Sequence, residues 1–167
     1  MGISEARGAI RPRLQHKVVH IQIANYLRKE EAAFDAYVFD FQEVVDLAAS
    51  TIPKSDDPLD PEAFASVSFA KEFRAALYTT AIRCRNPFIR RRALDLLNNA
   101  PRREGFGDSR MVTIIAKKVI EMEEEVLEDL VDLTGMVVPS EWARVVDIMM
   151  ADSAPGSDIC VHSIQFR

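Results

Sequence analysis

The sequence predicts an all-α protein, a helical bundle of about five helices with a small β-hairpin at its C-terminal end. Three observations lead to this prediction. Apolar residues recur at intervals of three and four along most of the chain, helix start and stop signals separate these stretches, and β-branched residues become dense only near the end. The chain has 167 residues, which is enough for one domain with a core of its own.

The first residues divide into two parts. Residues 1–13 hold two glycines and one proline with little periodicity, so we expect a disordered lead-in there. Residues 14–27 are dense in apolar side chains, which predicts a buried helix. The polar residues 28–31 that follow are compatible either with a bend or with a solvated turn of one longer helix.

The next three helices have clear signals. Residues 32–49 carry apolar side chains on one face, and Pro53 ends this amphipathic helix. Asp60-Pro61-Glu62 predicts the start of another helix, whose apolar stripe ends at Cys84. Asn86-Pro87 repeats the start signal, and the short helix behind it is predicted to bury Ile89, Ala93, Leu96 and Leu97.

The last long helix is predicted over residues 110–133. Asp108 or Ser109 is its expected N-cap, and Gly135 stands where a left-handed C-cap is expected. The predicted helical domain therefore covers residues 14–135.

The C-terminal extension, residues 136–167, fits two patterns. Residues 142–150 match helical spacing but also alternate, and residues 159–166 are rich in β-branched and aromatic side chains. The polar residues 152–158 between them suit a hairpin connection, which favours a β-hairpin.

Composition argues against several classes of protein. The formal net charge of -5 is unsuited to binding polyanions by bulk charge, and two cysteines provide neither a disulfide framework nor a thiolate cluster. No apolar stretch reaches the length of a membrane span, and the first residues lack the apolar core of a secretory signal. We therefore expect a soluble intracellular protein with no membrane association.

Two neighbouring segments carry opposite charge. Residues 83–110 hold eight arginines against three acids, and residues 117–132 hold two lysines against seven acids, so their net charges are +5 and -5. The arginines could contact nucleic acid, because guanidinium pairs well with phosphate. They could instead pair with the acids within the protein. We favour this second interpretation, since base-reading and aromatic residues are missing beside the arginines.

The candidate interaction or structural charge cluster comes from these two segments. Its arginines are expected to fix the loop 101–107 against the acidic helix. The candidate residues are Arg90, Arg91, Arg92, Arg102, Arg103, Glu121, Glu124 and Glu125.

Two other constellations have some of the features of a metal site. Glu121, Glu125, Glu128 and Asp132 share one helix face and could hold a divalent cation, but no histidine lies nearby in sequence, so a solvated face is favoured. His16 and His20 are four apart but lack further ligands at useful spacing.

Nucleophile and cofactor motifs are missing from the sequence. Cys84 lies on an apolar stripe and is expected to be an inert core thiol. No nucleophile elbow, phosphate loop or dinucleotide fingerprint occurs. We therefore predict no catalytic residue, no cofactor and no metal site.

Short motifs follow one another in a recognisable order. They are the basic turn 83–87, the loop 101–105 with the helix start at Asp108, and the apolar-then-acidic run 119–125. This series resembles the C-terminal part of the regulatory region in fungal zinc binuclear cluster transcription factors. Glu31–Tyr37 upstream and Glu141–Val145 downstream are similar to further segments of that region.

The resemblance implies a non-enzymatic, largely helical regulatory or interaction module of a nuclear protein that controls transcription. The family binds DNA through an N-terminal six-cysteine zinc cluster, which a chain with two cysteines lacks, so we expect a truncated relative or a fragment that does not read DNA in that way. Protein partners or self-association are expected, and the sequence does not specify whether a small effector binds. If the resemblance does not hold, we expect a cytoplasmic rather than a secreted protein, and the alternative function is direct nucleic-acid binding through Arg83–Arg110.

Overall fold

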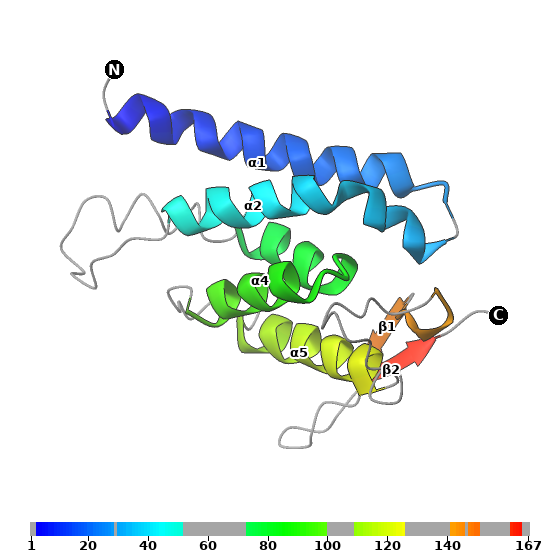
Figure 1. Cartoon of the computed structure of the whole chain (residues 1–167). Coiled ribbons are helices and arrows are strands. Elements are labelled where there is room, and N and C mark those ends of the chain that lie inside the picture. Colours follow the sequence, from blue (N-terminus) through cyan, green and yellow to red (C-terminus); the bar gives the residue numbers. More distant parts are fainter. Residues whose placement is uncertain are drawn as a thin grey trace.

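A computed structural model describes residues 3–28, 30–51, 73–99, 109–125, 141–145, 147–150 and 161–164. The five α-helices among these residues confirm the predicted helical bundle (Figure 1). In chain order the elements are α1 (Ile3–Asn25), η1 (Glu31–Tyr37), α2 (Val38–Thr51), a helix over 73–83, α4 (Pro87–Asn99), α5 (Ser109–Glu125), η3 (Glu141–Ala143), β1 (Asp147–Met150) and β2 (Val161–Ile164).

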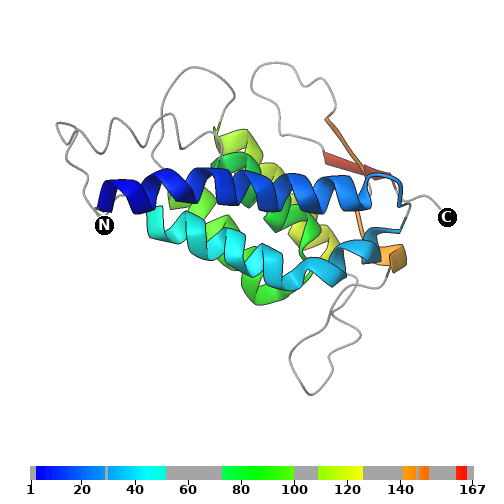
Figure 2. The same ribbon diagram turned by 90° about the horizontal axis from the view of Figure 1, so that it is seen from above.

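The helices are stacked in layers. α1 and α2 run antiparallel side by side, α2 contacts α4, and α4 contacts α5 (Figures 1 and 2). This order makes α1 the outermost helix at one end of the stack and α5 the outermost at the other. No helix among the residues that the structure describes is long and apolar enough to cross a membrane.

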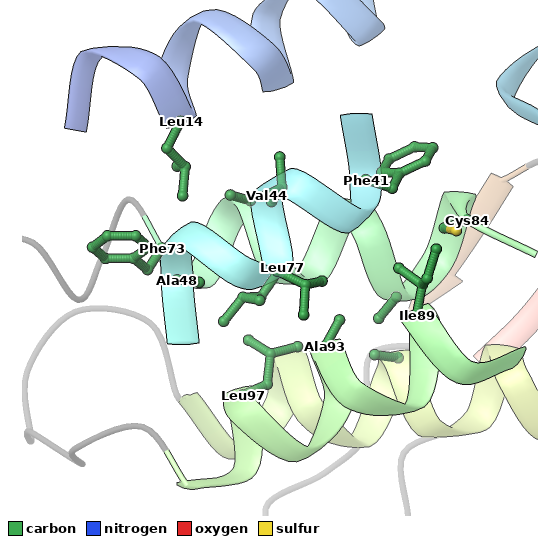
Figure 3. Close-up of a cluster of buried hydrophobic side chains, with 14 of the residues drawn as sticks. Leu14, Phe41, Val44, Ala48, Phe73, Leu77, Cys84, Ile89, Ala93 and Leu97 are labelled. Atoms are coloured by element: carbon green, nitrogen blue, oxygen red, sulfur yellow. The ribbon is translucent and has the colours of Figure 1, made fainter. Parts of the chain in front are cut away.

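One apolar core joins all five helices (Figure 3). Leucine, valine, phenylalanine and alanine side chains from successive helix turns meet there, as the intervals of three and four require. A smaller cluster of Ile115, Val119 and Val145 lies beside it, against α5. The core residues are Leu14, Ile21, Phe41, Val44, Val45, Ala48, Phe73, Ala76, Leu77, Ala81, Cys84, Ile89, Ala93, Leu97 and Ala116.

The beginning of the chain differs from the expected disordered lead-in over 1–13. α1 begins at Ile3 and continues through Pro12, although a proline inside a helix removes one backbone hydrogen bond. Leu14 is buried in the core, Ile10 packs against it, and Arg13 forms an ion pair of 2.6 Å with Glu43 on α2. These contacts with the bundle offset the weak helix propensity of the segment.

The prediction that residues 14–27 form a buried helix is wrong in one respect. Leu14 and Ile21 are buried, but Val19, Ile23 and Leu27 are 49%, 69% and 88% exposed. Because α1 is the outer helix of the stack, the bundle covers only one of its two apolar sides.

The helix α1 ends before the polar residues 28–31, with a turn at Tyr26 and Leu27. α1 ends at Asn25, the chain turns, and the segment predicted as one helix over 32–49 is divided into η1 and α2. The 3-10 geometry of η1 is tighter than an α-helix, and its first amides are bonded by a side chain from far along the chain.

The start signal at Asn86-Pro87 is confirmed. Asn86 Oδ1 accepts hydrogen bonds from the backbone N–H groups of Phe88 and Ile89 at 3.1 and 3.2 Å, which is N-capping of α4. α5 begins at Ser109, one of the two predicted caps. The predicted helix start at 60–62, the continuation of α5 through 126–133 and the C-cap at Gly135 lie outside the described residues.

The C-terminal extension contains two strands in the region where the hairpin was expected. β1 and β2 pair antiparallel, with Asp147 opposite Ile164 and Met150 opposite Val161. The predicted connection 152–158 lies outside the described residues.

Candidate functional site

A buried carboxylate lies at the centre of the charged residues. Glu123, on α5, is fully buried and accepts three hydrogen bonds. Arg85 Nη2 and the backbone N–H of Val145 donate to Oε1 at 2.8 and 2.9 Å, and Arg90 Nη2 donates to Oε2 at 2.8 Å. One side chain thus connects α4, α5, the junction before α4 and the segment after η3.

Arg85 links this centre to η1. Its Nη2 also contacts Glu31 Oε2 at 3.3 Å, and its Nη1 donates to the carbonyl oxygen of Arg83 at 2.6 Å. Arg83 Nη1 in turn donates to Glu31 Oε1 at 2.5 Å, and its guanidinium lies over the ring of Phe34, 5.4 Å from the centroid. The bend after α1 is therefore held to the junction before α4.

Residues 141–145 are attached to η1 by polar contacts. Glu141 accepts hydrogen bonds from the backbone N–H groups of Glu31 and Ala32 at 2.5 and 2.6 Å, so it caps η1 from a distance of more than 100 residues in sequence. Arg144 pairs with Asp35 through two hydrogen bonds of 3.0 and 2.6 Å. We call residues 141–145 the strap.

The buried charge network consists of Glu31, Asp35, Arg83, Arg85, Arg90, Glu123, Glu141 and Arg144. Glu31, Arg85, Arg90, Glu123 and Arg144 are its buried members, whereas Glu141 is exposed at its edge. The network has four guanidinium groups and four carboxylates, so its formal charges cancel. This balance matters because an unpaired charge in a protein interior is costly, whereas a paired and hydrogen-bonded one is tolerated.

Burial changes the pKa of Arg85. Removal from water lowers the pKa of its guanidinium group, whereas the negative charges of Glu123 and Glu31 raise it. Arg85 Nε and Arg90 Nη1 are buried without a hydrogen-bond partner in the structure. Most but not all of the hydrogen-bonding groups in the network therefore have a partner. Such a network specifies one arrangement of the chain, but it adds less stability than a fully bonded one would.

The predicted arginine cluster is divided by the fold. Arg90 is buried against Glu123, whereas Arg91 pairs at the surface with Glu124 at 2.5 Å. Arg92 does not face the acidic helix and pairs with Asp46 on α2 at 2.6 Å. Two of the three arginines therefore contact α5.

Glu121 and Glu125 have no bond to this network among the residues that the structure describes. Glu121 is exposed and lies near Lys117 and Lys118, at 3.7 and 3.9 Å on its own helix, and Glu125 is exposed. Arg102 and Arg103 lie outside the described residues.

Most of the network, including its central residue, was not predicted from the sequence. A signal was present: Glu123 follows the buried Val119 and Ile120 by four and three positions, and Arg90 precedes the buried Ala93 by three. Charged residues at core-facing positions of two helices indicate a buried pair.

The residues considered for metal binding or thiol chemistry have different surroundings. The rings of His16 and His20 stack at 6.2 Å, and the described residues contain no group of three His, Cys, Asp or Glu that could hold a metal ion. Cys84 is buried, and burial raises the pKa of its thiol to about 11. Cys160 lies outside the described residues.

The second feature of interest is an apolar surface on α1. Val19, Ile23, Tyr26 and Leu27 are 49%, 69%, 83% and 88% exposed, and we call them the α1 patch. Val19 and Ile23 are four apart on the helix, and Tyr26 follows three later in the turn that ends it, so the side chains lie along one side.

No family model, curated protein or solved structure matches the chain. The geometry itself separates two features. The charge network has its partners within the chain and organises the fold, whereas the α1 patch exposes apolar side chains at the surface.

Proposed function

We propose that this chain is a non-enzymatic regulatory module that acts by binding other protein surfaces in the nucleus, related to the regulatory regions of fungal zinc binuclear cluster transcription factors. The motif order between residues 83 and 125 supports the relationship. The mode of action is supported by a structural observation, the exposed apolar side chains of the α1 patch.

The α1 patch carries this proposal because exposed apolar residues gathered on one helix side are characteristic of protein interfaces. Large side chains such as Tyr26 and Leu27 lose contact with water when a partner helix covers them, which favours association. The buried charge network complements this role, because it holds the helices in one arrangement behind the patch.

Direct nucleic-acid binding through Arg83–Arg110 receives less support. Arg85 and Arg90 are buried, and Arg91 and Arg92 are paired with carboxylates. An arginine already bonded to a carboxylate must break that pair before it can contact a phosphate.

A reporter experiment tests the regulatory role. The full chain is fused to an unrelated sequence-specific DNA-binding domain, and transcription from a promoter carrying the matching site is compared with that given by the DNA-binding domain alone. We expect a several-fold change, in either direction, and a smaller change for the Ile23→Glu fusion.

The matched control is Phe88→Glu, because Phe88 on α4 is 69% exposed, as Ile23 is. This fusion should behave like the unsubstituted chain. Equal transcription from the full fusion and from the DNA-binding domain alone, at equal protein levels, contradicts a regulatory role.

A further inference from the structure

We infer that the α1 patch is a self-association surface, on which α1 of a second copy of this chain packs antiparallel. This inference rests on the proposed function, since it names the partner of the interaction surface. It starts from the position of α1, which has apolar residues on two sides although the bundle covers only one.

The spacing of the exposed side chains suits another helix. His16, Val19, Ile23 and Tyr26 are separated by three, four and three positions, and all four are exposed. This alternation of threes and fours is the pattern of a helix–helix seam. In both views no described element lies on the side of α1 opposite α2 (Figures 1 and 2).

The charges around the patch favour a copy of the same surface over a charged partner. The basic Arg13 and Lys17 of α1 are bonded to α2: Arg13 to Glu43 at 2.6 Å, and Lys17 to Asp40 at 2.5 Å and to Glu43 at 3.0 Å. An acidic peptide or a nucleic acid would have to compete with these pairs.

Gln15 and Gln22, on one flank of the stripe, are exposed and uncharged. The charged Arg28 follows Leu27 at the end of the patch and is exposed as well. In a two-fold interface, position i of one copy meets position j of the other while j meets i, so an uncharged flank avoids charge repulsion between the copies. The flank of Gln15 and Gln22 meets this condition.

The sequence positions also give a self-complementary register. In an antiparallel pair centred on position 21, Val19 of each copy faces Ile23 of the other, and His16 faces Tyr26. Antiparallel helices also place the opposite ends of their dipoles together. Each apolar side chain of this stripe then meets a side chain of the other copy.

Sedimentation equilibrium of the purified full chain, over about 1 to 200 μM, tests the inference. We expect the average mass to rise from 18.8 kDa toward twice that value with concentration. Ile23→Glu should raise the dissociation constant by about 100-fold or more, because the substitution places a charge in the interface twice. Phe88→Glu should leave it unchanged.

A mixing experiment tests the register. Ile23→Glu and Val19→Lys chains should each be monomeric alone but should associate when mixed, because the introduced glutamate of one copy would then face the introduced lysine of the other. Wild-type dimers together with no association in the mixture would overturn the antiparallel arrangement.

Two further outcomes separate this inference from the proposed function. A wild-type chain that stays at 18.8 kDa over the whole range overturns self-association. If the reporter still responds to Ile23→Glu in that case, the regulatory role stands and the patch binds a different protein. Dimers with no reporter response leave the self-association surface established and remove the regulatory role.

Discussion

Arg90 on α4 donates a hydrogen bond of 2.8 Å to Glu123 on α5, and both side chains are almost completely shielded from solvent. The two residues lie 33 positions apart in sequence. Because the same carboxylate also accepts from Arg85 and from the backbone of Val145, this contact belongs to a network that connects helices and strap. Substitution of Glu123 should therefore lower the stability of the protein more than substitution of the neighbouring acidic residues on α5.

Glu123→Gln should lower the free energy of unfolding by about 3 kcal/mol or more, because it removes the charge that compensates two buried guanidinium groups. Urea denaturation followed by circular dichroism measures the change. The matched control is Glu124→Gln, whose carboxylate pairs with Arg91 at the surface and whose loss should cost less than about 1 kcal/mol. Equal losses for the two variants would show that the buried pairing is not important.

The strap should be released by Glu141→Ala. This substitution removes both acceptors of the Glu31 and Ala32 backbone N–H groups. We expect hydrogen exchange of those two amides, and of Val145, to become at least about 10-fold faster. Glu30→Ala is the control, because Glu30 precedes η1 but forms no side-chain cap bond. Unchanged exchange in the Glu141→Ala variant would mean that the strap is held by other contacts.

The N-cap of α4 can be tested by itself. Asn86→Ala should destabilise the protein by about 1 kcal/mol, because two backbone N–H groups lose their acceptor. Asn86→Ser should retain most of the stability, since serine can accept the same bonds. Denaturant midpoints of the two variants measure this difference, and an alanine variant as stable as the serine variant would contradict the capping role.

Cys84 should be nearly unreactive in the folded protein. Its thiol pKa is raised to about 11 by burial, so little thiolate is present at pH 8. In a Cys160→Ser background, an aromatic disulfide reagent should label Cys84 slowly in buffer and fast in denaturant. Labelling in buffer at the rate of an exposed thiol would contradict the buried position.

The same raised pKa makes a prediction about alkaline pH. Because the folded state retains this proton above the ordinary value of 9.0, stability should fall as the pH rises from about 9 through about 11. Cys84→Ala should lack this part of the loss. A pH profile identical in the two variants would show that Cys84 makes no such contribution.

Much of the helical pattern could be predicted from the sequence because its causes are local. The step of three and four from Phe41 to Ala48, and the capping residue Asn86, act within one or two helix turns, and both are confirmed. The two oppositely charged segments also indicated correctly that arginines would meet acids, as the Arg91–Glu124 pair does.

The candidate site depended on contacts between residues distant in sequence. Glu141 bonds η1 across more than 100 positions, and Arg92 pairs with Asp46 rather than with the acidic helix, and no local pattern specifies such partners. The sequence of α1 is dense in apolar residues, but this density does not specify which of them are buried.

By itself, the sequence determined the helical character of α2, α4 and α5 and the spacing of their core-facing side chains, since both follow from the propensity and spacing of nearby residues. The tertiary structure alone decided that Glu123 is enclosed by Arg85 and Arg90, and that one apolar side of α1 remains exposed. Both outcomes depend on the order in which the helices stack. This order decides which charged side chains are buried next to one another, and it also decides which helix has a neighbour on only one side.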